Sequence, residues 1–161
     1  MPLNDIQNNN RNDFVHLGAF DIPRELKMLI KQGIWPQAGS NANTQESNPI
    51  VSTKITKLVW PNEDKVILMP PPFHTIEDEV KDGNKFWTEF LTNAGEIDYS
   101  KALIIADFGL GSDSPIVLYY DRLAPSVMYL KWSGGGTVPI KHSWILSHKS
   151  FTEFANELRL V

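Results

Sequence analysis

The stretch Leu103-Ile-Ile-Ala-Asp-Phe-Gly-Leu-Gly-Ser-Asp-Ser-Pro-Ile-Val-Leu-Tyr-Tyr-Asp121 decides the fold. One short apolar run begins it, a second from Ile116 to Tyr120 comes near its end, and small or polar residues lie between them. This pattern predicts a strand, a shaped turn and a second strand. The turn is built from Gly109, Gly111, Ser112, Asp113 and Pro115. Because the motif holds no nucleophile beside a base, it indicates backbone shape rather than catalysis.

Three carboxylates, Asp107, Asp113 and Asp121, surround the predicted hairpin. They could bind Ca²⁺, act as acid and base, or contact a partner. An Asp side chain also caps turns through its own hydrogen bonds to the backbone. We favour turn capping over contact with a partner, and either of these over catalysis.

Outward from the hairpin, the sequence predicts further strands and helices. Strands are expected at 51–60, 65–69 and 126–132, with a short one that includes 143–146, while 38–49 is expected to be a loop and 133–137 a flexible turn. Helices are expected at 21–33 (capped by Asp21), 75–83, 85–92 (capped by Asn84) and after Ser150, which opens a capping box. Helices, then strands, then a last helix indicate an α+β fold, with helices packed beside a mainly antiparallel sheet of about five or six strands.

Four tryptophans are expected to bury most of their rings in the core. They are Trp60, Trp87, Trp132 and Trp144. Trp35, between the first helix and a proline, is expected to be half exposed. The four histidines are expected at the surface or in turns, because no pair of them has metal-ligand spacing on a helix. They are His16, His74, His142 and His148.

The chain of 161 residues is expected to form one domain over 13–161, after a flexible polar tail at 1–12. It has no cysteine, which excludes disulfides and thiolate metal sites. The first residues lack the basic and apolar regions of a signal peptide, and no apolar run approaches the ~20 residues that span a bilayer. We therefore expect a cytoplasmic protein that does not contact membranes, and we predict no metal or other cofactor.

The net charge of −4 is unevenly distributed. Between positions 62 and 98 there are nine acidic and three basic residues, whereas 122–161 holds five basic and two acidic ones. Binding of nucleic acid by an overall basic surface is therefore disfavoured. An acidic patch could instead face a basic partner, although a solvated acidic surface is the simpler interpretation. The candidate patch comprises Glu63, Asp64, Glu77, Asp78, Glu79 and Asp82.

Two glycine-containing motifs resemble parts of phosphate-binding and phosphate-transferring sites. Asp107-Phe-Gly109 spells the metal-binding tripeptide of protein kinases, but the kinase catalytic-loop signature is missing. Gly134-Gly-Gly136 lacks the Gly-Lys-Ser/Thr of a phosphate-binding loop, so a loose hairpin connection is expected. The sequence therefore predicts a protein that is not an enzyme. A small hydrolase that uses Asp107, Asp113 or His148 is the alternative from another class.

Four motifs, in the same order along the chain, resemble those of the SUKH superfamily, the Smi/Knr-type proteins. The hairpin motif, Ala106-Asp-Phe-Gly-Leu-Gly-Ser-Asp-Ser-Pro-Ile-Val-Leu118, is similar to the family's signature turn. The others are Met69-Pro-Pro-Pro-Phe-His-Thr75, Pro125-Ser-Val-Met-Tyr-Leu130 and Ser150-Phe-Thr-Glu-Phe-Ala155. The likeness covers roughly residues 60 to 160. The chain departs from it at Tyr119, where the family often has Asp.

The resemblance implies a non-catalytic α+β protein that binds other proteins. Bacterial members act mainly as immunity proteins, each of which binds and blocks a cognate toxin, often a nuclease or deaminase. Fungal members resemble regulatory or scaffolding proteins of cell-wall assembly. The leading hypothesis is therefore an immunity protein whose partner is a toxin, and a regulatory scaffold is the alternative. The oligomeric state stays open.

Overall fold

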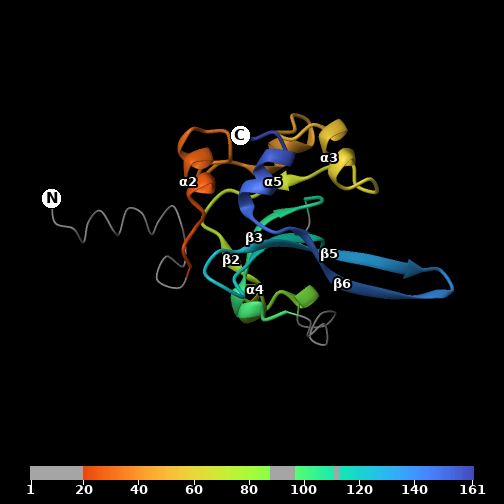
Figure 1. The fold of residues 1–161 in the computed structure, drawn as a ribbon. Coiled ribbons are helices and arrows are strands. Elements are labelled where there is room, and N and C mark those ends of the chain that lie inside the picture. The colour runs from red at the N-terminus through yellow and green to blue at the C-terminus, as the bar shows by residue number, and fades with distance from the viewer. Residues whose placement is uncertain (1–19, 88–96, 111–112) are drawn as a thin grey trace.

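The structure, a computed structural model, describes residues 20–87, 97–110 and 113–161. Its centre is an open antiparallel sheet of six strands with helices packed on both faces (Figure 1), which confirms the predicted α+β fold. The expected tail at 1–12, His16 and the second half of the expected helix at 85–92 lie outside the described residues. Within the described part, no helix has the length and apolarity needed to cross a bilayer.

The sheet has the order β1-β3-β4-β5-β6, and β2 pairs with β3 beside β1. Its strands are β1 Ile67–Leu68, β2 His74–Thr75, β3 Ala102–Asp107, β4 Pro115–Tyr119, β5 Ser126–Gly135 and β6 Val138–His148. The predicted β3–β4 hairpin is confirmed, with Leu103 opposite Leu118. The last hairpin is longer than expected, because the ladder continues through most of the glycine-rich segment and only positions 136 and 137 form the turn.

The helices are α2 Arg24–Lys31, α3 Thr53–Val59, α4 Ile76–Lys81 and α5 Phe151–Glu157, with 3₁₀ turns at Ala42–Glu46 (η1) and Tyr99–Lys101 (η3). The predicted capping box of α4 is present, since Thr75 and Asp78 each accept the other's backbone N–H. Ser150 caps α5 as expected. The expectation that Asp21 caps α2 is wrong, because Pro23 stands at that position without a side-chain cap.

The segment expected to be a strand at 51–60 is a helix, α3. Ser52 begins it by accepting the N–H of Ile55. The apolar residues that looked like an imperfect alternation instead follow helical spacing, because Ile55 and Thr56 are buried on one side while Leu58 is exposed. The β-branched residues of this segment favour a strand. The capping residue Ser52 and the burial of one helix face against the sheet favour a helix, and the helix forms.

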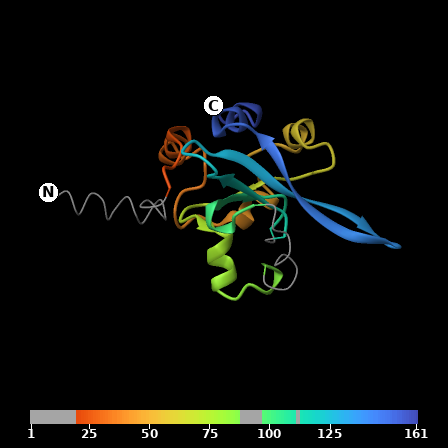
Figure 2. The ribbon, with the colours of Figure 1, turned by 60° about the horizontal axis from the view of Figure 1, so that its bottom comes forward.

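The two faces of the sheet carry separate clusters of buried side chains. The larger cluster lies under α2, α3 and α5, which cover one face together (Figures 1 and 2). The smaller one lies under α4 on the opposite face and includes Ile76, Val117, Leu130 and Trp144. Neighbouring residues of β4 alternate between the two clusters, as the pleat of a strand requires.

Three expectations about individual rings are wrong. Trp35 is fully buried, and its Nε1 donates to the carbonyl of Met69 at 2.8 Å. Trp132 is 36% exposed, because its strand runs beyond the body of the sheet. His148 is buried against Phe154 rather than lying at the surface. The burial of Trp35 depends on a contact between segments 34 positions apart in the sequence.

Candidate functional site

A bulge in β3 places a carboxyl group on the less covered face of the sheet. Ile104 pairs with Val117 and Ala106 pairs with Ile116, so Ile105 is an extra residue. Because an extra residue reverses the alternation of a strand, Asp107 shares the face of Ile104 instead of pointing into the larger cluster. The β3–β4 hairpin thus holds a polar group that regular alternation alone would place in the core.

The carboxyl group of Asp107 is held by the turn that follows it. Its oxygens accept the N–H groups of Gly109 at 3.1 Å and Ser114 at 3.3 Å. Asp107 therefore caps the β3–β4 turn. Burial, and secondarily the negative charge of Asp113, raise the pKa of Asp107 to about 7.

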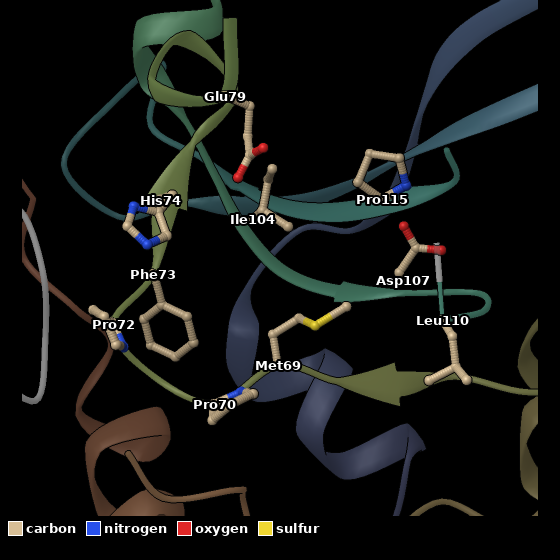
Figure 3. A pocket seen from close by; sticks show the side chains of 10 residues that line it. All are labelled: Met69, Pro70, Pro72, Phe73, His74, Glu79, Ile104, Asp107, Leu110 and Pro115. Atoms are coloured by element: carbon tan, nitrogen blue, oxygen red, sulfur yellow. The ribbon is translucent and has the colours of Figure 1, made fainter. Parts of the chain in front are cut away.

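Asp107 lines a pocket of about 440 Å³ that lies between β1, β2, β3 and α4 (Figure 3). Most of its lining is apolar and comes from the proline-rich segment after β1 and from the hairpin. Three side chains bring polar groups to it: Asp107, Glu79 and His74. The lining residues are Met69, Pro70, Pro72, Phe73, His74, Glu79, Ile104, Asp107, Leu110 and Pro115; we name this site the acidic pocket.

Glu79 and His74 reach the acidic pocket from two adjoining elements. The Glu79 carboxylate points from α4 toward Ile104, and the His74 ring lies on the neighbouring strand β2 (Figure 3). Glu79 also accepts a hydrogen bond from Asn84 Nδ2 at 3.2 Å, which steadies its side chain. Sequence analysis included Glu79 only as part of a candidate surface patch. The sequence feature that could have indicated a pocket is the proline run, which holds Met69 and Phe73 opposite the hairpin.

The residues of the predicted turn have different surroundings. Gly109 donates to Asp107, while Gly111 and Ser112 lie outside the described residues. Asp113 is exposed, and its carbonyl oxygen accepts the Nε1 proton of Trp132 at 2.6 Å. Asp121 lies beyond the opposite end of β4, 3.9 Å from Arg122. The structure thus brings Asp107 and Asp113 together and leaves Asp121 apart from them.

The six acidic residues of the candidate patch lie on both sides of the sheet. Glu63 and Asp64 follow α3, whereas the other four belong to α4 and its end; α3 and α4 cover opposite faces (Figure 2). The Lys57 ammonium lies 2.6 Å from Asp64 and lowers the pKa of its carboxyl group. Burial raises the pKa of Glu63. The α4 residues are Glu77, Asp78, Glu79 and Asp82.

Tyr119 has a structural role at the end of β4. Its ring packs against the smaller cluster, and its hydroxyl oxygen accepts the N–H of Asp98 at 3.1 Å. This contact joins the end of β4 to the start of η3. An Asp side chain is shorter than a Tyr side chain, so an Asp at position 119 would have to lie closer to Asp98 to accept the same N–H.

A second group of polar atoms lies where β6 meets α5. Ser147 Oγ is 2.8 Å from His148 Nδ1, and His148 Nε2 is 3.0 Å from Glu157 Oε2. These are the residue types of a serine hydrolase. However, the imidazole is packed between the rings of Trp60 and Phe154, and Trp60 Nε1 donates to the same Ser147 oxygen. The array ties β6 to α5, and it does not line the acidic pocket that holds Asp107.

Beyond the body of the sheet, β5 and β6 continue as a two-stranded ribbon over 131–141, in which every residue is exposed (Figure 1). Trp132 pairs with His142, so Ile140, two residues from His142, lies on the same face, whereas the register shift between Ser133 and Gly135 puts Val138, opposite Gly135, on the other face. Val138 is 58% and Ile140 66% exposed. We name Trp132, Val138 and Ile140 the apolar strip. Sequence analysis missed it because 133–137 was expected to be a flexible turn after a strand that ends at Trp132.

Among the residues that the structure describes, no group of three or more His, Cys, Asp or Glu side chains could hold a metal ion. Comparisons of the chain with protein-family models, with curated proteins and with solved structures found no match. The acidic pocket and the ribbon are the two candidate binding sites of the described structure.

Proposed function

We propose that this protein is a non-catalytic protein-binding domain and, more specifically, an immunity protein that binds and neutralises a cognate toxin in the cytoplasm. The observation that carries the proposal is the apolar strip on the β5–β6 ribbon. Large apolar side chains exposed along one narrow ribbon are typical of a surface that another protein covers.

The edge of the ribbon supports the same proposal. In the described part of the chain, β6 pairs only with β5, so one side of its eleven residues leaves backbone groups available to an added strand. Pro139 and Lys141 lie on the same strand, and residues of these types discourage unwanted pairing of edge strands. The edge thus combines protection against aggregation with exposed apolar side chains that a specific partner would cover.

The motifs that resemble the SUKH superfamily narrow the partner to a toxin, of which nucleases and deaminases are the expected kinds. The acidic side chains of α4 favour a partner with a basic surface, because opposite charges accelerate encounter. A regulatory scaffold of the same fold is the alternative, and it would bind its partner without inhibiting it.

The test is co-expression with a toxin encoded beside this gene, together with a binding assay on the purified pair. We expect the intact chain to restore growth and bind the toxin. The double substitution Val138→Ser and Ile140→Ser should weaken binding by at least about tenfold, since central apolar anchors dominate such interfaces. Leu123→Ser is the matched control: this side chain is 90% exposed but lies in the β4–β5 loop, away from the ribbon.

Two outcomes would contradict the proposal. If no adjacent toxin is encoded, bound or neutralised, the immunity function fails. If the toxin is bound but the double substitution behaves like Leu123→Ser, the apolar strip is not the binding surface. Binding without loss of toxin activity would favour the scaffold.

A further inference from the structure

We propose that the acidic pocket binds a cation carried on an apolar stem, namely an alkylguanidinium or alkylammonium group. Free amines and the Arg and Lys side chains of another protein both present this chemistry. The inference rests on the pocket alone and goes beyond the proposed function, because the ribbon could bind a toxin whether or not the pocket is occupied.

The shape and lining of the pocket suit such a stem. Its volume of about 440 Å³ lies toward the small end of the range for ligand sites. Met69, Phe73 and Ile104 offer apolar surface around the cavity (Figure 3). Apolar walls with a few converging polar groups are the usual composition of a ligand site, and the methylene stem of a Lys or Arg packs well on such walls.

The charges around the pocket favour a ligand that carries a positive charge. Glu79 and Asp107 place carboxyl groups on two sides of the cavity, and Asp113 adds negative charge near Asp107. Among the lining residues, only His74 can carry a positive charge. Because a cavity with apolar walls has a low effective dielectric constant, these charges attract a cation more strongly than they would in water. An anion would be repelled by the same groups.

A ligand of this kind would also complete the hydrogen bonding of the site. Asp107 is 1% exposed and its oxygens accept the N–H groups of Gly109 and Ser114, so it acts on a ligand chiefly through its charge. Glu79 accepts one N–H from Asn84 and has acceptor capacity left. A guanidinium group, with its five N–H donors, can serve several such acceptors at once.

The titration of Asp107 gives the site a dependence on pH. With a pKa of about 7, this carboxyl group is partly protonated at neutral pH, and a bound cation favours its ionised form. The other groups that face it or the cavity are Asp113 from the hairpin, Glu79 from α4 and His74 from β2. Protonation of Asp107 lowers the attraction for a cation, so affinity should fall as the pH is lowered from 8 to 6.

The experiment is an NMR titration of the full chain, observed at the methyl groups of Met69 and Ile104, with n-butylguanidinium as the probe. Its neutral isostere n-butylurea is the control for shape. We expect saturable shifts with n-butylguanidinium and binding at least about tenfold weaker with n-butylurea. Glu79→Gln should weaken n-butylguanidinium binding roughly tenfold, as expected when a charged hydrogen-bond acceptor is lost. Glu77→Gln, on the same helix but outside the pocket lining, should change it less than twofold.

The proposal is overturned if n-butylguanidinium does not bind, if n-butylurea binds equally well, or if Glu79→Gln and Glu77→Gln behave alike while both keep the amide spectrum of the folded protein. N-acetyl-arginine methylamide distinguishes the two sources of the cation. Binding as tight as that of n-butylguanidinium supports a partner's Arg side chain, whereas binding of n-butylguanidinium alone supports a small free alkyl cation. None of these measurements needs the toxin, so failure of the pocket proposal and failure of the immunity function are distinguishable.

Discussion

At one edge of the sheet, β1 is two residues long and fully buried, whereas at the other edge β6 runs for eleven residues and extends past the body of the protein. The β1 edge is closed by a side chain. Gln45 Nε2 donates to the carbonyl of Leu68 at 2.7 Å, and Gln45 Oε1 accepts the N–H of Leu68 at 2.9 Å. The amide of Gln45 thus replaces the backbone of a missing strand.

The comparison shows that the fold protects one edge completely and leaves the other open. Exposed sheet edges are sites of unwanted association, and proteins normally shorten or cover them. Covering β1 with Gln45 and Trp35 follows that rule and also builds a wall next to the acidic pocket, because Met69 extends directly from β1. The long β6 edge departs from the rule, which is why we assign it to a partner.

The largest effect on the free energy of unfolding should come from removing the side chain that closes the β1 edge. Gln45→Met keeps the approximate length of the side chain but removes both hydrogen bonds, which leaves the N–H and carbonyl of Leu68 unpaired in the interior. At roughly 2 kcal/mol for each orphaned group, the free energy of unfolding should fall by about 4 kcal/mol, measured by urea denaturation. Asn43→Ala, an exposed residue of the same 3₁₀ turn, should change it by less than about 0.5 kcal/mol. A loss that is equal in both variants would contradict the role of Gln45.

The closed edge shows how far sequence reasoning reaches. The β3–β4 hairpin, the capping box at Thr75 and the last helix were predictable, because their signals lie within a few residues of each other. Gln45 stands in a polar segment that is correctly expected to lack strands, but nothing local indicates that its amide bonds to a residue 23 positions away. Side chains that act across such separations are visible only once the fold is known.

The candidate site was partly predictable for the same reason. Turn capping by Asp107 followed from the residue type and its place before a glycine. Its position in a pocket depends on the bulge at Ile105, and no residue of the apolar run predicts that bulge. The ribbon was missed because three glycines in succession favour a turn, whereas the ladder of β5 and β6 tolerates two of them.

A smaller effect on the free energy of unfolding should come from the titration of Asp107. This residue lies next to the closed edge, because it pairs with Ile67 of β1. Burial raises the pKa of Asp107 from 3.8 to about 7 on folding, so the folded state binds more protons than the unfolded state between these values. Stability must therefore fall as the pH rises through this window. The contribution of Asp107 between pH 5 and pH 7 should be about 2 kcal/mol, obtained from urea denaturation at each pH.

Three variants test the assignment of this pH dependence. Asp107→Asn should remove the contribution, and Asp113→Asn should reduce it, because the charge of Asp113 raises the pKa of Asp107. Asp121→Asn, an exposed acid at the far end of β4, should leave it unchanged. A pH dependence of equal size in wild type and Asp107→Asn would assign it to other groups.

The smallest effect on global stability should come from disturbing the open edge. Gly134 has φ = 89° at the irregular end of β5, and an added Cβ would clash with the carbonyl group of Pro139, whose carbon lies 2.8 Å from it. In a buried sheet such a clash would be severe. Here the ribbon is exposed along its whole length, so it can open locally and limit the cost of Gly134→Ala to the free energy of that opening. We expect a global loss under about 1 kcal/mol together with faster amide exchange confined to 131–141. A loss of several kcal/mol would mean that the ribbon is part of the cooperative core, and the contrast between the two edges would then be one of shape alone.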